Sequence, residues 1–139
     1  MTAIIEMLRK HEGVETHAYK CTANKTTIGV GRNIDPKGGI GLSSDEINYL
    51  LANDVKRVNT ELTGVFSWYK TLCTARKDAM IDMCFNMGLP RLMKFKKALA
   101  GMAIGDYDEA AIEFLDSRWA NQVGQRAITV TDIIRSGDY

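Results

Sequence analysis

Three side chains that can do acid–base chemistry lie within the stretch HEGVETHAYKCTANKTTIGVGRN, residues 11–33. Glu12 carries a carboxyl group, Cys21 a thiol and Thr27 a hydroxyl, with eight residues between the first two and five between the last two. A protonated carboxyl can donate a proton, a thiolate can act as a base or a nucleophile, and a hydroxyl can hold a water molecule. The stretch is therefore an active site with a thiol as its second member, an inert copy of one, or no site at all.

The segment that leads into this stretch has the pattern of a short amphipathic helix. Residues 2–13 place apolar side chains at helical spacing, with Thr2 as the predicted N-cap and Gly13 directly after the last turn. Glu12 then lies in the last turn, where the negative end of the helix dipole opposes ionisation of a carboxyl group. The alternative for Glu12 is an ordinary exposed helix glutamate.

Two stretches rich in β-branched and aromatic residues follow, at 16–20 and 26–33. They predict the two strands of a hairpin, with the sequence CTAN between them. Gly29 and Gly31 would weaken an ordinary strand, but they allow backbone or a ligand to approach closely.

The later segments predict helices. Ser43 and Glu46 make a capping box at the start of the clearest one, residues 43–62, and Gly101 and Gly137 close two of the others. The fold class is therefore α+β. We expect a single domain, 1–139, with a β-rich lobe at 13–42, a connecting helix at 43–62, and helical parts at 1–12 and 62–139. Within 62–139, the predicted helical segments are 74–88, 90–101, 106–124 (two helices) and 125–137.

The composition is that of an ordinary globular protein, with 45% hydrophobic and 25% charged residues and a net charge of +1. This balance argues against a broad basic face for nucleic acid, and hence against a small helical nucleic-acid binder. One local basic cluster is either a solvated helix face or a surface attracted to an anionic wall: Arg91, Lys94, Lys96 and Lys97.

The sequence predicts no metal and no cofactor. Cys21, Cys73 and Cys84 are odd in number and widely spaced, which argues against a zinc site or a full disulfide framework and favours a reducing cytosol. The stripe of Met80, Met83 and Met87 predicts a helical core rather than a cofactor site. The N-terminus lacks the features of a secretory signal, and no apolar run approaches the roughly 20 residues of a membrane span.

Several motifs carry a resemblance to a known family. EMLRKHEG, AYKCT, TTIGVGR, AMIDMCFNMG, YDEAAIEFLDSRWANQ and QRA resemble, in this order, the phage endolysins of the T4-lysozyme type, glycoside hydrolase family 24. The resemblance covers nearly the whole chain and departs from the family mainly in a shortened stretch between Arg32 and Ser43. It implies a lysozyme-like fold and muramidase activity, the cleavage of the β-1,4 bond between N-acetylmuramic acid and N-acetylglucosamine in peptidoglycan.

The resemblance also implies roles for the three residues of the first stretch. Glu12 matches the family's general acid, and Thr27 its threonine; Cys21 stands where members carry an aspartate or sometimes a cysteine. Cys21 would either activate a water that Thr27 also holds, giving inversion, or attack the sugar directly, giving retention. We favour inversion, because direct attack leaves Thr27 without a purpose. An inert copy and an engineered Asp→Cys change stay open.

Further residues match the family outside that stretch. Arg126 matches an arginine expected near Glu12, its alternative being a plain surface arginine. The side chain of Phe85 either lines the substrate groove or packs in the hydrophobic core. The resemblance suggests these substrate-binding positions: Asn33, Phe85, Asn86, Ala98 and Glu113.

The resemblance finally implies a setting for the protein. We expect a monomer without stable membrane insertion, made in the host cytoplasm and released to the cell wall through a holin. A rival interpretation is a non-catalytic peptidoglycan-binding module in which Cys21 marks lost chemistry.

Overall fold

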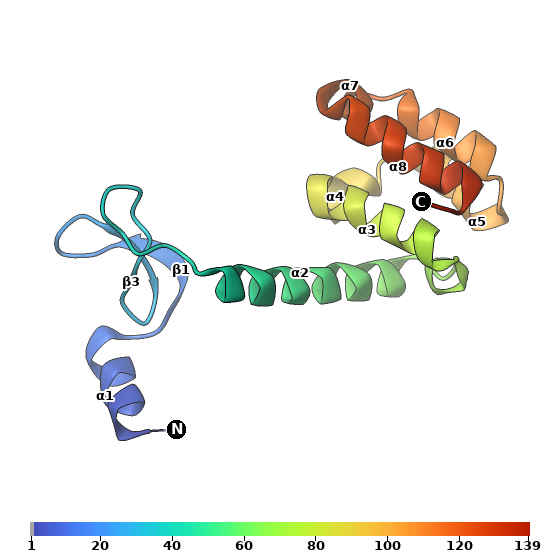
Figure 1. Ribbon diagram of the computed structural model, residues 1–139. Coiled ribbons are helices and arrows are strands. Elements are labelled where there is room, and N and C mark those ends of the chain that lie inside the picture. Colours follow the sequence, from blue (N-terminus) through green and yellow to red (C-terminus); the bar gives the residue numbers. More distant parts are fainter. Residues whose placement is uncertain (1) are drawn as a thin grey trace. The chain divides into compact units, whose positions relative to one another are not determined.

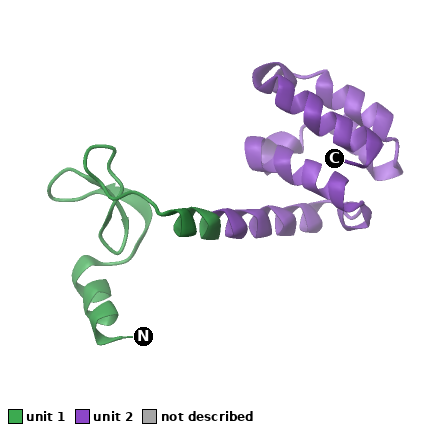
Figure 2. Cartoon of the chain, in the orientation of Figure 1, with its two compact units in different colours: residues 1–50 green, residues 51–139 purple. Residues whose placement is uncertain are grey.

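The computed structural model describes residues 2–139. The chain divides between Leu50 and Leu51 into two compact units, called unit 1 and unit 2 below (Figure 2). Unit 1 contains a small antiparallel sheet, and the remainder of the chain is mostly helical (Figure 1). The predicted α+β class is therefore confirmed.

Unit 1 begins with the predicted amphipathic helix, α1 (Ala3–Glu12). The helix ends because Gly13 adopts a φ of 78°, a left-handed value that glycine tolerates well. Thr2 occupies the N-cap position, but its side chain makes no capping hydrogen bond. The sheet that follows has the order β1-β2-β3: β1 (Glu15–Lys20), β2 (Thr26–Gly29) and β3 (Arg32–Asn33).

The second predicted strand, 26–33, is wrong as a single element, because it forms two strands joined by a tight turn. Gly29 and Gly31 have φ values of 70° and 65°, which reverse the chain at no steric cost to glycine. The expected close approach occurs at Gly31. A Cβ built there would lie 2.8 Å from Oε2 of Glu12.

The predicted long helix is α2 (Ser44–Val65), which extends three residues beyond the expected end. Its capping box is confirmed: the amide of Glu46 donates to the Ser43 hydroxyl at 3.2 Å, and the amide of Ser43 donates to the Glu46 carboxylate at 3.0 Å. Arg32 reaches the same carboxylate at 2.8 Å, so β3 is tied to the start of α2. The single-domain boundaries stay a prediction.

Unit 2 holds the hydrophobic core, which includes the methionine stripe: Met80 and Met83 are 0% exposed and Met87 is 7% exposed. The segment 106–124 forms two helices, and Gly137 ends the last helix, both as expected. The helical elements are η1 (Tyr69–Thr71), α3 (Thr74–Met87), α4 (Leu89–Leu92), α5 (Lys96–Ile104), α6 (Tyr107–Leu115), α7 (Arg118–Val123) and α8 (Gln125–Ser136).

The predicted helix at 90–101 is wrong in extent. It is divided into α4 and α5, and α5 continues past Gly101 to Ile104. Gly105, in the left-handed conformation, ends α5 instead. Gly101 serves close packing, since a Cβ there would lie 3.0 Å from the carbonyl oxygen of Asp106 and 3.3 Å from Cβ of Ala110.

Candidate active site

Glu12 is the last residue of α1, and its exposed side chain lies against the turn between β2 and β3. The contact exists because Gly31 has no side chain: a Cβ at that position would clash with the carboxyl oxygen. The absence of a side chain at Gly31 therefore allows the carboxyl group of Glu12 to lie beside the sheet.

Cys21 and Thr27 are brought together by the β1–β2 hairpin. Tyr19 pairs with Thr27 in the sheet, and Cys21 follows β1 in the turn. The turn is closed by two backbone hydrogen bonds, from the Cys21 amide to the Lys25 carbonyl at 3.0 Å and from the Asn24 amide to the Cys21 carbonyl at 2.8 Å. Asn24 adopts the left-handed φ of 60° that this tight turn requires.

The hydroxyl of Thr27 is buried, with the residue 4% exposed. It donates to the carbonyl oxygen of Lys25 at 2.8 Å, the same oxygen that accepts from the Cys21 amide. A hydroxyl has one proton and two lone pairs, so this bond leaves the oxygen of Thr27 able to accept from a water.

The sulfur of Cys21 lies in a polar environment. Hydrogen bonds from the backbone of Lys25 and then of Ala23 lower the pKa of the Cys21 thiol, and the smaller effect of burial raises it. The thiolate is the reactive form of cysteine. The turn thus raises the fraction of Cys21 that can act as a base or nucleophile at neutral pH.

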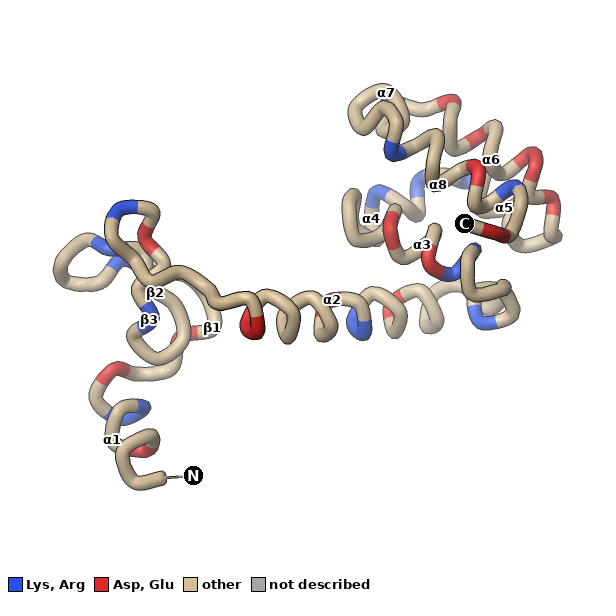
Figure 3. Tube along the Cα trace, viewed as in Figure 1, with Lys and Arg blue, Asp and Glu red and all other residues tan. Residues whose placement is uncertain are grey.

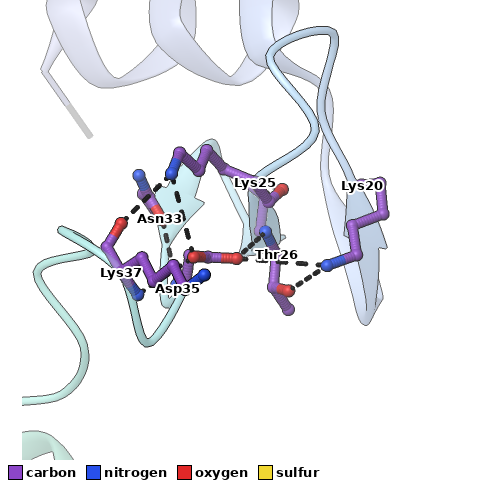
Figure 4. A network of polar contacts seen from close by, with 7 residues as sticks. Lys20, Lys25, Thr26, Asn33, Asp35 and Lys37 are labelled. Carbon is purple, nitrogen blue, oxygen red and sulfur yellow. Dashed lines mark hydrogen bonds and ion pairs between the residues drawn. The ribbon is translucent and has the colours of Figure 1, made fainter.

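Asn33 lies on β3 directly opposite Thr27. Its side-chain oxygen accepts from the Asp35 amide at 2.9 Å, so part of the amide group is engaged within unit 1. Asp35 is the centre of a polar network that also reaches Lys20, Lys25 and Thr26 (Figure 4).

Arg126 and Phe85 lie in unit 2, where both line a cavity of about 340 Å³. The guanidinium of Arg126 donates to Asp82 at 2.9 Å, and Phe85 is 45% exposed, which excludes the core alternative for its ring. The pairing of Arg126 with Glu12 stays a prediction.

Ala98 and Glu113 line a second cavity in unit 2, of about 430 Å³. Lys94, Lys96 and Lys97 of the basic cluster line the same cavity and are exposed, so both interpretations of the cluster stay predictions (Lys and Arg are blue in Figure 3). The remaining predicted substrate residue, Asn86, accepts the indole N–H of Trp119 at 2.8 Å.

Two further findings concern the part of the chain that the structure describes. Within residues 2–139, no group of three His, Cys, Asp or Glu side chains could hold a metal ion. None of the helices there is long and apolar enough to cross a membrane.

Two polar residues of these sites were not predicted. Asp82 pairs with Arg126, and the spacing along the chain gives no signal for that pair. Asp35 had a signal, since Asp-Pro-Lys is typical of a turn in which the aspartate side chain accepts the amide two residues on. Lys37 donates that bond at 3.0 Å.

The fold and the arrangement of Glu12, Cys21 and Thr27 together have the features of the lysozyme-like hydrolases: an acid at the end of a helix, beside a small sheet whose hairpin carries a thiol and a hydroxyl, in a chain that is otherwise helical. Comparison with known proteins specifies the family. The chain belongs to the family described as Phage lysozyme, which it matches over residues 9–132. It is therefore a lysozyme-type glycoside hydrolase with a muramidase-like lytic function.

Its relatives include cellular and viral proteins. The chain is 27% identical to Probable T4-type lysozyme 2 of Dictyostelium discoideum, over 99% of this chain and 96% of the relative. It is 28% identical to the Pre-baseplate central spike protein Gp5 of Enterobacteria phage T4, over 98% of this chain and 28% of that protein. It is 25% identical to the Endolysin of Acyrthosiphon pisum secondary endosymbiont phage 1, over 86% of this chain and 80% of that protein.

Proposed function

We propose that the protein is an endolysin that hydrolyses the β-1,4 bond between N-acetylmuramic acid and N-acetylglucosamine in peptidoglycan. Membership of the phage lysozyme family supports the substrate class. The observation that carries the proposal is that the amide of Cys21, whose thiol pKa is lowered, and the buried hydroxyl of Thr27 donate to the same carbonyl oxygen of Lys25.

In the proposed reaction, Glu12 donates its proton to the leaving oxygen as the bond from that oxygen to the anomeric carbon breaks. The hydroxyl of Thr27 holds a water, and the thiolate of Cys21 takes a proton from it while the water oxygen bonds to the anomeric carbon. Attack from the face opposite the leaving group inverts that carbon. Glu12 then regains a proton from solvent, and Cys21 releases one.

Direct attack by the Cys21 sulfur is the alternative, through a thioglycoside that water later hydrolyses with overall retention. The two routes are separated by following the anomeric form of the first product by NMR. An initial α-anomer supports the inverting route, and an initial β-anomer refutes it.

The enzyme is tested on chloroform-treated Gram-negative cells. We expect the purified protein to reduce turbidity and the Glu12→Gln variant to lose that activity, because an amide cannot donate the required proton. Binding of the parent protein to cells without clearing would support the peptidoglycan-binding module instead.

The remaining assignments belong to the same proposal. Arg126 supports the general acid, and the substrate-binding side chains are those of Asn33, Phe85, Asn86, Ala98 and Glu113. The protein acts as a monomer that reaches the wall from the host cytoplasm through a holin. The relative named Endolysin supports this setting.

A further inference from the structure

The peptide bond between Lys25 and Thr26 is hydrogen-bonded at both of its polar atoms. Its carbonyl oxygen, from Lys25, accepts from the amide of Cys21 at 3.0 Å and the hydroxyl of Thr27 at 2.8 Å. Its N–H, from Thr26, donates to Oδ1 of Asp35 at 3.0 Å. One rigid peptide plane therefore joins Asp35 to the candidate catalytic thiol and hydroxyl.

Beyond the end of β3, the side chain of Asp35 replaces one hydrogen bond of the sheet's backbone ladder. The Thr26 carbonyl accepts the amide of Ile34 at 2.9 Å, as in a ladder between β2 and the segment after β3. In a continued antiparallel ladder the Thr26 amide would donate back to the carbonyl of Ile34, but the Asp35 carboxylate supplies the acceptor oxygen instead. The side chain thereby extends the sheet by one hydrogen bond.

The carboxylate is itself held firmly, with its side chain 11% exposed. Hydrogen bonds from the amides of Thr26 and then Lys37 lower the pKa of Asp35, which keeps the group ionised at neutral pH. The charged groups that face it are Lys20 on β1 and Lys25 in the turn, each with Nζ 4.0 Å from a carboxylate oxygen (Figure 4).

We propose that Asp35 is a positioning residue that orients Cys21 and Thr27 through the peptide bond between Lys25 and Thr26. An ionised acceptor on the N–H polarises the amide and makes its carbonyl oxygen a stronger acceptor. The stronger acceptor holds the proton of Thr27 and leaves the lone pairs of that hydroxyl for the water. The proposal rests on the proposed function, since it assigns Asp35 to the same reaction.

The test uses the full chain with Asp35→Asn, which is nearly isosteric but presents an NH₂ group where the Lys37 amide needs an acceptor. We expect kcat to fall by about tenfold or more, since small misplacement of reacting groups is costly, while KM changes by less than about threefold. The pH midpoint for alkylation of Cys21 by iodoacetamide, resolved by peptide mass spectrometry, is expected to rise because the hydrogen bonds that lower the thiol pKa loosen.

Glu46→Gln is the matched control, because it also removes an ion-paired, hydrogen-bonded carboxylate from unit 1 without touching the Lys25–Thr26 peptide. It should leave kcat and the alkylation midpoint of Cys21 unchanged. Cys73, which is exposed in unit 2, gives an internal reference in the same samples. If Asp35→Asn does not fold, Asp35→Glu keeps the charge but moves the oxygens, with the same expected direction.

The outcomes separate the two proposals. Unchanged kcat and an unchanged Cys21 midpoint in a folded Asp35 variant would overturn the role of Asp35. Equal losses in the Asp35 and Glu46 variants would overturn it too, because they would indicate general destabilisation. A raised midpoint with full kcat would keep the role of Asp35 in the turn and refute catalysis by Cys21.

Discussion

A thiol can replace a carboxylate at residue 21 only if enough of it is ionised when the substrate is bound. A free cysteine is only a few per cent thiolate at pH 7, whereas an aspartate is fully ionised. The turn between β1 and β2 narrows this difference, since the backbone of Lys25 and Ala23 lowers the pKa of Cys21. The site therefore has a physical means of using sulfur as a base.

This argument predicts the effects of substitution at Cys21. Cys21→Ser should reduce kcat by about 100-fold or more, within the usual range for loss of a general base, because a serine hydroxyl does not ionise near neutral pH. Cys21→Asp should stay within about tenfold of the parent, since an aspartate is ionised at pH 7. The measurement is the initial rate of turbidity loss, with folding checked by circular dichroism.

A thiol-blocking reagent provides the control for this series. It should inactivate the parent protein and leave the Cys21→Asp variant active, although both retain Cys73 and Cys84. Full activity of Cys21→Ser would mean that residue 21 only fills space.

At the scale of elements, Glu46 joins the start of α2 to the sheet. Hydrogen bonds from Arg32, then from Ser43, lower the pKa of Glu46 from 4.5 to about 2. Because the folded-state pKa is the lower one, the stabilisation is fully present above pH 4.5 and is lost as the pH falls towards 2. We expect Glu46→Gln to lower the midpoint of thermal unfolding at pH 7, and this difference from the parent to shrink below pH 4.5. A constant difference down to pH 2.5 would contradict the ionic origin.

Two helical glycines give a second test at this scale. Gly101→Ala should destabilise unit 2 by about 1–3 kcal/mol, the range for overpacking, because its Cβ would press on the backbone of Asp106 and Ala110. Gly64→Ala in α2 is the matched control, with no atom within 4 Å of the new Cβ, and should stabilise by up to about 1 kcal/mol. Urea unfolding measures both. A change in unfolding free energy of the same sign in the two variants would contradict close packing of α5 on α6.

At the scale of the whole molecule, local signals predicted most of the elements. The capping box at Ser43 and the glycines at 13 and 137 correctly mark helix boundaries, because caps act within a few residues. Gly101 was misread as a terminator, since its role depends on a neighbouring helix that no local pattern reveals.

The site was predictable to a similar degree. Spacing alone places Cys21 and Thr27 on one hairpin, and the structure joins them at the Lys25 carbonyl. The partner of Arg126 is 44 residues away in the sequence, so spacing could not identify Asp82. The network of Asp35 likewise depends on how the loop after β3 returns to β2.

The two units differ in their share of the core, which predicts unequal stability against local opening. Every buried apolar residue of the described chain lies at Val58 or beyond, and Thr27 is the one buried residue among the described part of unit 1. Segments with few buried apolar contacts open more readily than core helices. Native-state hydrogen exchange should therefore give amides of α3 and α8 protection at least about 100-fold above that of β1 and β2. Equal protection would mean that the sheet opens only when the helical core unfolds.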